Sequence, residues 1–586
     1  MTTDTQISRI LKGLLMTDRG QTADVGCQEG YKKDEMQIMS SIQKDLGIPE
    51  LIARVLVSRG IESPEEAEAF LHPKLDNLSD PFLLPDIEKG LDRTIKAIVK
   101  KENICIYGDY DADGITATAL MVNFFRHLEL LPEVYLPKRE EGYSLNVEAI
   151  NKIKAKGTKL LICVDCGSSN VMEILEAGKL GMDVIVIDHH ELPEIIPNAS
   201  AIINPKRKDS LFPTRELAAC GVTFFFLWAL RRVMHNNGLL KNTINLKQEL
   251  DLVTIGTLGD MVPLTKDNRI LVKFGIAIMK DKPRLWLRSF FKKNLIPRKG
   301  IDEYALNFII IPRINATGRV SDPEISLRFL TSIDEHTSEN YLIKLNEANT
   351  RRQNKGKQIF DEISETIKNG NHRNRNSLVF FNEGWHIGVI GIVAQKLVEK
   401  YGKPAIVITE VNNVCKGSGR GGDGFNLHEA LSSLSPLLLK YGGHKYACGI
   451  SLSRDNLSIF EEAFENSTGG TIETGKKRVI ADARADLEDM TSELLELIES
   501  LSPFGVGNTR PCFSFPASQI SANGNNRVKV TDKKGRIWNG YNQSQSPVPG
   551  TKDISIIASP VLREDVGEKF IHLNIKEIIQ SDYPTL

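Results

Sequence analysis

Three short apolar runs constrain the fold of this chain more than any other feature. Residues 103–107, 159–164 and 183–187 are nearly continuous aliphatic stretches, and segments with helical spacing at 116–128 and 147–156 separate the first two. Strands that are apolar on both faces are typical of parallel sheets that helices cover on both sides. The runs therefore predict a doubly wound α/β domain built on a parallel sheet.

Acidic residues and histidines follow these runs directly. In open α/β sheets, ligands bind beyond the carboxyl ends of the strands, where side chains from separate strands converge. Carboxylates and imidazoles gathered in this way suit hard divalent cations, and such clusters hydrolyse phosphate esters. The candidates are Asp109, Asp111 and Asp113 after the first run, Asp165 after the second, Asp188, His189 and His190 after the third, and Asp260 after a further strand-like run.

The spacing of the first three aspartates favours a metal site. Asp109, Asp111 and Asp113 alternate along the chain, so their side chains share a face if the segment is extended. Carboxylates this close repel one another strongly unless cations neutralise them. Taken alone, an Asp-x-Asp-Gly sequence is more often a turn, and an Asp-His-His sequence can be an ordinary loop. Their occurrence together at successive strand ends indicates a two-metal site.

Composition sets broad limits. The 586 residues are too many for one hydrophobic core and predict three or four domains. Lys and Arg total 74 against 75 Asp and Glu, so the overall charge does not indicate nucleic-acid binding. A local basic groove is still compatible with this total. No apolar run approaches the roughly 20 residues that cross a bilayer, and the first 37 residues lack a signal-peptide core. We therefore expect a cytosolic protein without a membrane partner.

The eight cysteines form no disulfide framework. Cys163 and Cys166 make a C-x-x-C pair, which in other contexts binds zinc or does redox chemistry. Here Asp165 lies between them and no second pair follows. Buried, reduced thiols are the favoured interpretation.

Breaks in the pattern divide the chain into several parts. A charged, proline-free stretch predicts one long helix that joins two domains, although an ordinary surface helix fits the pattern equally well. Short alternating strands near the C-terminus indicate a small β-barrel. The predicted segments are a poorly ordered extension at 1–47, an α/β domain with N-terminal helices at 48–334, the long helix at 335–370, a smaller α/β domain at 371–466 and a β-rich domain at 467–586.

Four motifs occur in a fixed order. They are Gly-Asp-Tyr-Asp-Ala-Asp-Gly at 108–114, Val-Asp-Cys-Gly at 164–167, Asp-His-His at 188–190 and Gly-Thr-Leu-Gly-Asp-Met-Val-Pro at 256–263. Further motifs continue the series at 136–145, 217–222, 312–319 and 385–392. From about residue 48 onward, the chain resembles the DHH phosphoesterases, and specifically the RecJ single-strand-specific exonucleases.

The resemblance implies roles for the acidic residues. Two divalent cations, manganese or magnesium, would bind, with Asp165 as the likeliest bridge between them. Tyr107 stands where many relatives carry histidine, so no ligand role is assigned there. The implied metal ligands are Asp111, Asp113, Asp165, His189 and Asp260, and the other catalytic residues are Asp109, Asp188, His190 and Arg139.

The resemblance also implies a substrate site in a cleft between the DHH domain and the smaller, DHH-associated domain. Guanidinium groups in loops can grip phosphate oxygens, and a glycine loop lets backbone N–H groups approach an anion. Alternatives stay open for two side chains: Arg319 can pair with Asp322, and Trp385 can belong to the core. The implied substrate-binding residues are Arg313, Asn315, Arg319, Trp385, His386, Gly419, Arg420, Gly443 and His444.

The C-terminal domain is expected to be an oligonucleotide-binding (OB-like) barrel. The motif at 503–508 matches the RecJ pattern, but Thr509-Arg510 replaces the usual Pro-acid pair. Because aromatic residues are few in this domain, we expect it to contact the backbone of a single strand rather than its bases.

The resulting functional hypothesis is a monomeric, metal-dependent 5′-to-3′ exonuclease of single-stranded DNA in repair and recombination, with a helicase or a single-strand-binding protein as partner. The polarity and the DNA preference come from the resemblance. One alternative is a DHH phosphodiesterase of short oligonucleotides or cyclic dinucleotides, whose members are usually shorter. Another is a non-catalytic nucleic-acid-binding or replication-scaffold protein, which would have lost metal ligands that this chain retains.

Overall fold

The computed structural model describes residues 33–142, 144–370, 375–422, 424–469, 479–524, 526–543, 552–565 and 568–580. These residues form two compact units. The larger unit comprises residues 68–476 and 501–510, and the smaller unit comprises the N-terminal segment up to 67 together with residues 477–500 and 511–586. Each unit is described by itself below.

The larger unit contains the predicted parallel sheet. Its strand order is β2-β1-β3-β4-β5, and all four pairings are parallel. The three apolar runs are β1, β3 and β4, and their side chains are buried except that of Asp183, the first residue of β4. The strands are β1 (Ile104–Tyr107), β2 (Glu133–Tyr135), β3 (Leu160–Val164), β4 (Asp183–Ile187) and β5 (Ala201–Ile203).

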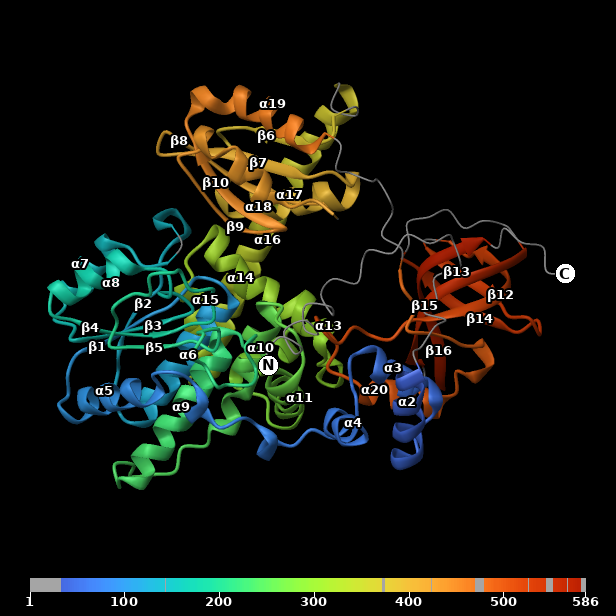
Figure 1. The fold of residues 1–586 in the computed structure, drawn as a ribbon, viewed down its shortest axis with the longest axis horizontal. Coiled ribbons are helices and arrows are strands. Elements are labelled where there is room, and N and C mark those ends of the chain that lie inside the picture. The colour runs from blue at the N-terminus through green and yellow to red at the C-terminus, as the bar shows by residue number, and fades with distance from the viewer. Residues whose placement is uncertain are drawn as a thin grey trace, which may run out of the picture. The chain divides into compact units, whose positions relative to one another are not determined.

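Helices cover both faces of this sheet (Figure 1). One face packs on α7 and α8, whose apolar residues share a core cluster with the outward side chains of β1, β3 and β4. The other face packs on α5, α6 and α9 within a larger cluster that continues into the helices beyond. The prediction of a doubly wound domain is therefore confirmed. These helices are α5 (Ile87–Val99), α6 (Ala112–His127), α7 (Val147–Ala155), α8 (Val171–Lys179) and α9 (Ala219–Asn236).

A helical region follows the sheet and leads into the long helix. Between α13 and α14 lies a π-helical segment, Leu306–Ile310. The predicted long helix is present as α16 (Glu335–Asn369), with Asp334 capping its first turn through a bond from the Thr337 N–H. The helices before it are α10 (Leu250–Gly259), α11 (Lys266–Asp281), α12 (Leu285–Lys292), α13 (Glu303–Ala305), α14 (Ile311–Val320) and α15 (Glu324–Leu330).

The second α/β domain of this unit has a mixed sheet in the order β6-β7-β8-β10-β9. Helix α17 covers one face, and α18 and α19 pack in a core cluster on the other. The elements are β6 (Leu378–Phe381), α17 (Ile387–Tyr401), β7 (Ala405–Val411), β8 (Val414–Arg420), α18 (Leu427–Ser433), β9 (Lys440–His444), β10 (Ala447–Leu452) and α19 (Leu457–Thr468).

The smaller unit contains the predicted barrel. Strands β12, β13, β14, β16 and β15 pair in that order, and a further pairing of β12 with β15 closes the ring, which confirms the OB-like fold. The elements are β11 (Ala483–Arg484), α20 (Ser492–Ser500), β12 (Phe513–Ala522), β13 (Arg527–Thr531), β14 (Ile537–Asn542), β15 (Lys552–Asp565) and β16 (Glu568–Gln580).

Structure begins earlier along the chain than the sequence pattern indicates. Part of the expected extension forms α2 (Lys33–Leu46), which packs on α3 (Glu50–Ser58), while α4 (Pro64–Leu71) contains the boundary between the units. Met39 and Ile42 are the buried residues of α2, and this pair is too small to give a clear amphipathic signal among charged neighbours. Residues 1–32 lie outside the described part of the chain.

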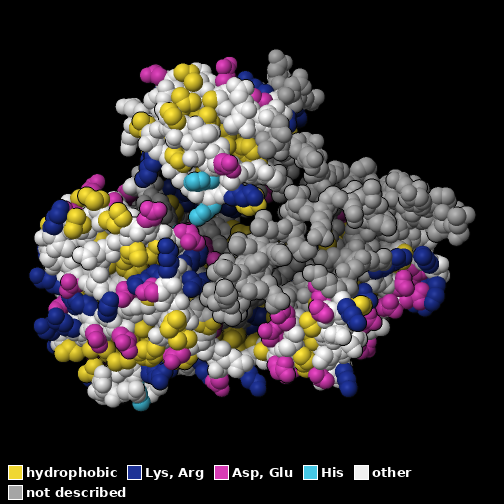
Figure 2. Space-filling view, in the orientation of Figure 1, with side chains coloured by type: hydrophobic (Ala, Val, Ile, Leu, Met, Phe, Trp, Pro, Cys, Tyr) yellow, Lys and Arg dark blue, Asp and Glu magenta, His cyan; other side chains and the backbone are white. Residues whose placement is uncertain are grey.

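Surface character agrees with the net charge of -1. On the face seen in Figure 2, basic and acidic side chains are interspersed rather than gathered into one field. Among the described residues, no helix has the length and apolarity that crossing a bilayer requires.

Helix α10 packs tightly against α6, and Gly256 makes this possible. A Cβ atom on Gly256 would lie 2.4 Å from Thr116 Oγ1, 2.5 Å from Cys220 Sγ and 2.8 Å from Asp113 Oδ1. All three neighbours are fully buried, so they have little room to move.

We expect Gly256→Ala to destabilise the larger unit by about 1–3 kcal/mol, because the added methyl overpacks a dense core. The melting temperature measured by calorimetry should fall. Gly178→Ala on α8 is the matched control, since a Cβ there has no atom within 4 Å. That control should melt at or slightly above the wild-type temperature. Equal melting of the two variants would contradict the packing argument.

Candidate metal centre and nucleic-acid site

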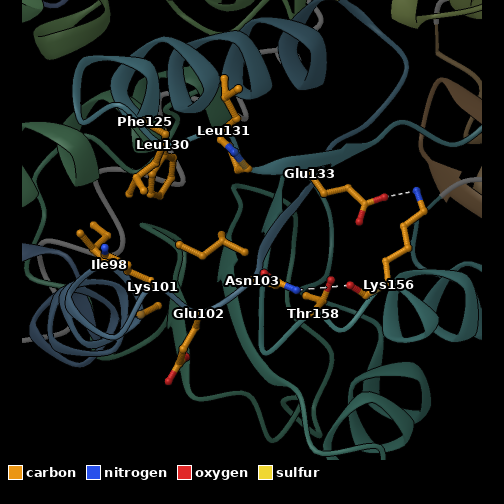
Figure 3. A pocket seen from close by; sticks show the side chains of 13 residues that line it. Ile98, Lys101, Glu102, Asn103, Phe125, Leu130, Leu131, Glu133, Lys156 and Thr158 are labelled. Atoms are coloured by element: carbon orange, nitrogen blue, oxygen red, sulfur yellow. Dashed lines mark hydrogen bonds and ion pairs between the residues drawn. The ribbon is translucent and has the colours of Figure 1, made fainter.

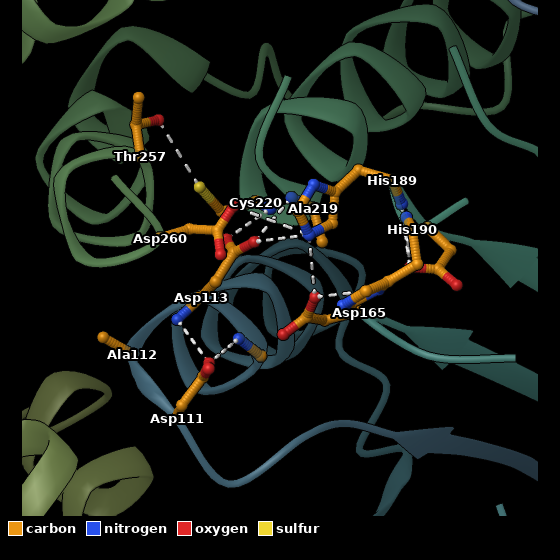
Figure 4. A network of polar contacts seen from close by, with 12 residues as sticks. Asp111, Ala112, Asp113, Asp165, His189, His190, Ala219, Cys220, Thr257 and Asp260 are labelled. Atoms are coloured by element: carbon orange, nitrogen blue, oxygen red, sulfur yellow. Dashed lines mark hydrogen bonds and ion pairs between the residues drawn. The ribbon is translucent and has the colours of Figure 1, made fainter. Parts of the chain in front are cut away.

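The first acidic motif crosses from β1 into α6 at the carboxyl edge of the sheet. Asp111 is the N-cap of α6, and its Oδ1 accepts hydrogen bonds from the N–H groups of Asp113 (2.9 Å) and Gly114 (3.2 Å). Asp113 lies in the first turn and is fully buried. Its two oxygens accept hydrogen bonds from the N–H groups of Ala219 (2.6 Å) and Cys220 (2.8 Å) at the start of α9 (Figure 4). The start of α9 therefore orients this carboxylate.

Asp165 and Asp188 end the next two strands. The Asp165 N–H bonds to Ile187 O at 3.0 Å and the Asp188 N–H to Ile203 O at 3.1 Å, so the neighbouring strands fix both positions. Asp165 has a φ of 62°, a left-handed conformation that aspartate tolerates better than most residues. Such backbone strain is common at functional sites.

Asp260 reaches the same edge from a different kind of element. The apolar run before it is the helix α10, with Asp260 as its C-cap, and not the strand that the sequence indicated. Every residue from Leu250 to Leu258 is buried, so this helix shows no polar face from which its period could be recognised. Asp260 nevertheless lies beside His189, and its role as a metal ligand stays a prediction.

The side chains from these elements converge on His189. Its Nε2 lies 3.5 Å from Asp165 Oδ1, 3.6 Å from Asp260 Oδ2 and 3.9 Å from Asp113 Oδ2. Three groups could each hold a metal ion, with ligand atoms within 4.8 Å of one another: Asp165, His189 and His190; Asp113, His189 and Asp260; and Asp109, Asp111 and Asp165. Asp165 and His189 each belong to two of the groups. All five predicted metal ligands therefore lie together.

Asp188 has a different task from these ligands. Its oxygens accept hydrogen bonds from the N–H groups of Ser168 (3.0 Å) and His189 (2.8 Å), and its Oδ1 lies 2.7 Å from His190 Nδ1. These bonds and the two histidines hold the pKa of Asp188 well below its usual range despite burial. Burial alone would lower the pKa of His190, but the bond to Asp188 raises it to about 9. Asp188 thus holds the His190 ring in place, and its role in catalysis stays a prediction.

The site has the properties of a cation site. His189 Nε2 and Asp109 Oδ1 are buried and have no hydrogen-bond partner in the described part of the chain. The carboxylates around His189 lie too far away for hydrogen bonds. Burial and then neighbouring carboxylates raise the pKa of Asp109 and Asp165 well above the usual range, and that of Asp260 to about 8. Without a cation beside them, the ionised forms of these carboxylates are unfavourable. Oxygen and imidazole donors in this arrangement fit manganese or magnesium.

Arg139 and Arg319 lie next to the acidic motif. The Arg139 guanidinium stacks on the Tyr110 ring, 4.4 Å from its centroid, and donates to Gly318 O at 3.2 Å. Arg319 donates to Gly388 O at 3.3 Å and makes no ion pair with Asp322 among the described residues. Burial and the neighbouring arginines lower its pKa to about 10. Both arginines and His386 line a cavity of about 310 Å³ between the two α/β domains.

Two other predicted substrate residues hold the protein together. Arg313 donates to Asn346 Oδ1 at 2.7 Å and to Ile309 O at 2.6 Å, which ties α14 to α16 and to the π-helical segment. Asn315 Oδ1 accepts the Ala112 N–H at 2.7 Å and so holds the acidic loop. A direct role for either side chain in substrate binding stays a prediction.

Trp385 and His386 lie at the start of α17. Trp385 packs against the core cluster of its domain, which is the alternative that the sequence left open, and its indole N–H donates to Glu362 at 3.1 Å. His386 is the N-cap of α17, and its Nδ1 accepts the Gly388 N–H at 3.0 Å.

The glycine-rich run is a strand and not the expected anion-binding loop. Residues 417–420 belong to β8, which pairs on both sides, so the sheet uses their N–H groups. Gly419 is buried against Leu427, while Ser418 and Arg420 project from the opposite face, where Arg420 bonds to Ser418 Oγ at 3.1 Å. The side chains of this strand, rather than its backbone, are thus the candidates for substrate contact.

The second glycine motif is also a strand. Gly443 and His444 belong to the edge strand β9 and are exposed. The φ of Gly443 is 137°, which favours glycine.

Sequence reasoning missed a cation of the long helix. Arg352 of α16 lies near Arg313 and Arg319, its Nε is buried without a partner, and its NH2 group donates to Asn349 at 2.9 Å. The only sequence signal is the motif Asn349-Thr-Arg351-Arg352, which any charged surface helix could contain.

A further cavity lies at the opposite edge of the parallel sheet. It measures about 360 Å³ and is lined by residues that precede β1, β2 and β3 or begin them, including Asn103, Glu133 and Thr158 (Figure 3). Lys156 pairs with Glu133 across it. This amino edge of the sheet holds none of the predicted site residues.

Three family models match the chain. They describe the DHH family, N-terminal domain, at residues 103–257, the DHHA1 domain at residues 374–468 and the RecJ OB domain at residues 481–577. The single-stranded-DNA-specific exonuclease RecJ of Bacillus subtilis is 33% identical over 94% of this chain and 71% of its own length. The chain belongs to the RecJ family. The RecJ of Escherichia coli is also 33% identical and matches over 80% of this chain and 83% of its own length.

Solved RecJ structures share the fold. A crystal structure of Thermus thermophilus RecJ in complex with Mn²⁺ matches with a TM-score of 0.80 at 23% identity, over 94% of this chain and 78% of that chain. A crystal structure of exonuclease RecJ bound to manganese matches with a TM-score of 0.58 at 28% identity, over 68% of this chain and 98% of that chain. The predicted family and domain types are confirmed.

We expect Asp165→Asn to raise the melting temperature in EDTA at pH 8, by about 1 °C per kcal/mol of repulsion removed in a unit of this size. The folded-state pKa of Asp165 is raised, so its contribution to stability is present at low pH and is lost as the pH rises. Asparagine removes the charge and keeps the shape. Calorimetry of the variant and the wild type measures the difference.

The matched control is Asp92→Asn on the exposed side of α5, which should leave the melting temperature unchanged. Saturating Mn²⁺ should stabilise the wild type, by about 2.7 kcal/mol at a hundred times the dissociation constant, and should stabilise Asp165→Asn less. A variant that melts below the wild type in EDTA would contradict the repulsion argument.

Proposed function

We propose that this protein is a metal-dependent exonuclease that hydrolyses single-stranded DNA from the 5′ end. The observation that carries the proposal is the cluster of buried carboxylates around His189, with Arg139 and Arg319 beside it. Its RecJ relatives are single-stranded-DNA-specific exonucleases, and the donor set matches the metals found in solved RecJ structures.

The acidic cluster would hold two divalent cations, manganese or magnesium. Asp111, Asp113, Asp165, His189 and Asp260 are the proposed ligands, with Asp165 shared, and the unpartnered Asp109 Oδ1 adds a further donor. Two such cations supply an activated water and stabilise the leaving oxygen of the phosphodiester. No side chain of this chain is then required as a covalent nucleophile.

The protein contributes rigid positions and charge. Asp188 holds the His190 ring, the start of α9 holds Asp113, and Asn315 holds the loop that carries Asp111. Arg319 faces the site without a carboxylate partner, so a phosphate of the strand supplies its counter-charge. Arg139 lines the same cavity as Arg319 and adds a second positive charge there.

The OB barrel is proposed to bind the strand as well. Arg527 pairs in register with Tyr541, and Lys529 pairs with Asn539, so these exposed side chains share one face of β13 and β14. Two cations beside an exposed aromatic ring suit a single strand. Tyr541 therefore adds a base-stacking candidate to a domain whose sequence indicated backbone contacts alone.

The biological setting is proposed on the same basis. Degradation of single strands from one end suits DNA repair and recombination in the cytosol, with a helicase or a single-strand-binding protein to supply the strand. We propose that the protein acts as a monomer, since the metal donors all come from one chain.

The alternative, a phosphodiesterase of short oligonucleotides or cyclic dinucleotides, has less support. The RecJ OB domain follows the DHH and DHHA1 domains in this chain. A dinucleotide bound at the metal centre is too short to contact the exposed basic face of a separate barrel as well. A non-catalytic scaffold has less support, because the chain retains all the proposed metal ligands and their donor atoms lie close together.

We expect the wild type with Mn²⁺ to release a 5′ label from a single strand in the first turnovers. A 3′ label should stay on progressively shorter strands and be released last. Asp165→Ala should lose activity at least a hundredfold, since even the outer partners of metal ligands contribute about 10–100-fold. Product analysis on denaturing gels measures both. An intact strand with the wild type, or full activity in Asp165→Ala, would refute the proposal, and faster turnover of dinucleotides would favour the alternative.

We expect Arg319→Ala to raise KM for single strands about tenfold and to lower the salt slope of binding by about one, because one phosphate contact is lost. Steady-state kinetics and anisotropy at several salt concentrations measure these effects. Arg328→Ala on the neighbouring α15 is the control, since Arg328 is exposed and forms its ion pair with Glu324 of its own helix. Equal effects of the two substitutions would show that Arg319 does not bind the substrate.

A further inference from the structure

A buried asparagine lies at the carboxyl end of β5, beside the metal centre. Asn204 directly follows the last residue of β5, and none of its surface is exposed. Its amide nitrogen donates to Ser168 Oγ at 3.0 Å and to His190 O at 2.9 Å, and its amide oxygen accepts the Lys206 N–H at 2.9 Å. Each polar atom of this side chain therefore binds the protein, so Asn204 acts on a cation only through its neighbours.

Asn204 closes a ring of hydrogen bonds that joins the ends of β3, β4 and β5. Ser168 follows β3, and its N–H donates to Asp188 Oδ2 at 3.0 Å. Asp188 follows β4, and its Oδ1 lies 2.7 Å from His190 Nδ1. The bond from Asn204 to the His190 carbonyl completes the ring. Ser168, Asp188 and Asn204 are buried, so water does not readily replace a partner that is lost.

The ring fixes the backbone that carries both imidazoles of the histidine segment, residues 188–191. The His189 N–H donates to Asp188 at 2.8 Å, so the ring holds the chain on both sides of His189. Both imidazoles lie next to Asp165 (Figure 4): His189 Nε2 is 3.5 Å and His190 Nδ1 is 3.9 Å from Asp165 Oδ1. Metal sites need their donors held within about 0.5 Å of the productive geometry. A small rotation of the histidine segment would therefore disturb two donor positions at once.

The bond from the Lys206 N–H extends the ring to a fourth segment. Lys206 Nζ lies 3.2 Å from Glu191 Oε1 and 3.3 Å from Glu216 Oε2. Glu191 belongs to the histidine segment, and Glu216 precedes the start of α9, which orients Asp113. Asn204 and Lys206 thus connect the two imidazoles to the element that holds a proposed metal ligand from another strand end.

A side chain that only filled space at the end of β5 would be apolar. The two residues before Asn204 are apolar and buried. Burying an amide is unfavourable unless hydrogen bonds satisfy it. Two of the bonds from Asn204 end on the segments after β3 and β4, which carry Asp165 and His189. This placement indicates a role at the metal centre and not in the core.

We propose that Asn204 is a positioning residue of the metal centre, which holds His189 and His190 in place for the cations. The inference rests on the proposed metal-dependent function and extends it to a residue that does not itself touch a cation. Outer partners of metal ligands fix the orientation of those ligands, and their loss typically weakens metal binding about 10–100-fold.

The test measures the dissociation constant of Mn²⁺ by titration calorimetry, independently of nuclease activity. We expect Asn204→Ala to weaken Mn²⁺ binding about 10–100-fold. Ser168→Ala opens the same ring at another bond and should weaken binding about fivefold, the equivalent of one neutral hydrogen bond. In Asn204→Ala/Ser168→Ala the two effects should not add, because the ring is already open. The kcat of Asn204→Ala on single strands should return toward the wild-type value as the Mn²⁺ concentration is raised.

Asn103→Ala is the matched control. Asn103 lies at the amino edge of the same sheet, where its amide donates to Lys156 O at 3.3 Å. This variant should bind Mn²⁺ as the wild type does. Melting temperatures in EDTA show that each variant is folded during the titration. A merely structural role of Asn204 would lower the melting temperature and leave the Mn²⁺ affinity of the folded protein unchanged.

The outcomes separate failure of the inference from failure of the proposed function. If the wild type binds Mn²⁺ but cuts no strand, the proposed function fails, and the ratio of dissociation constants still decides the role of Asn204. A wild type that binds no Mn²⁺ refutes both. The inference alone is overturned if folded Asn204→Ala binds Mn²⁺ as tightly as the wild type, or if Asn103→Ala loses as much affinity. Should Asn204→Ala not fold, Ser168→Ala decides, and unchanged Mn²⁺ binding in that variant overturns the inference.

Discussion

The repulsion among buried carboxylates is the constraint on which the rest of the catalytic domain depends. Asp109, Asp113 and Asp165 are nearly inaccessible to solvent and lie within reach of the same histidine or of one another. A chain that collapsed freely would separate such groups or protonate them. Here the strand ends and the starts of helices hold them together. The stability of the surrounding core therefore offsets the repulsion among the carboxylates.

The backbone supplies the restraint. Asp113 faces the N–H groups at the start of α9, where the helix dipole favours negative charge, and Asp188 is surrounded by N–H donors and a histidine. Asp109 and Asp165 have fewer such donors. Burial nevertheless raises the pKa of Asp109, Asp113 and Asp165 alike, so backbone donors orient a carboxylate here without removing the cost of its charge.

Much of this arrangement could be predicted from the sequence, for a physical reason. Parallel strands buried on both faces leave continuous apolar runs, and ligands lie directly after them, so β1, β3 and β4 and their acids could be predicted by pattern alone. The same reasoning misassigned α10, because a helix buried on every side also lacks periodicity. It misassigned β8 because glycine signals a loop, whereas here Gly419 makes room for Leu427 within a sheet. The partners of Arg313, Asn315 and Arg352 lie far along the chain or depend on the packing of α16, and no local pattern encodes them.

Helix α14 links the two halves of the proposed active site. A Cβ on Gly318 would lie 2.1 Å from Tyr110 O, and one on Gly388 would lie 1.9 Å from Arg319 O, so glycine lets α14 touch both the acidic loop and the start of α17. Arg319 projects from the helix between these contacts and lines both the 310 Å³ cavity and a larger one of about 810 Å³ that Leu258 and Phe308 also line. Any shift of α17 against α14 would therefore move Arg319, the proposed phosphate-binding residue, relative to the proposed metal ligands. The second domain is thus packed directly against the helix that carries Arg319, independently of any residue that it contributes to strand binding.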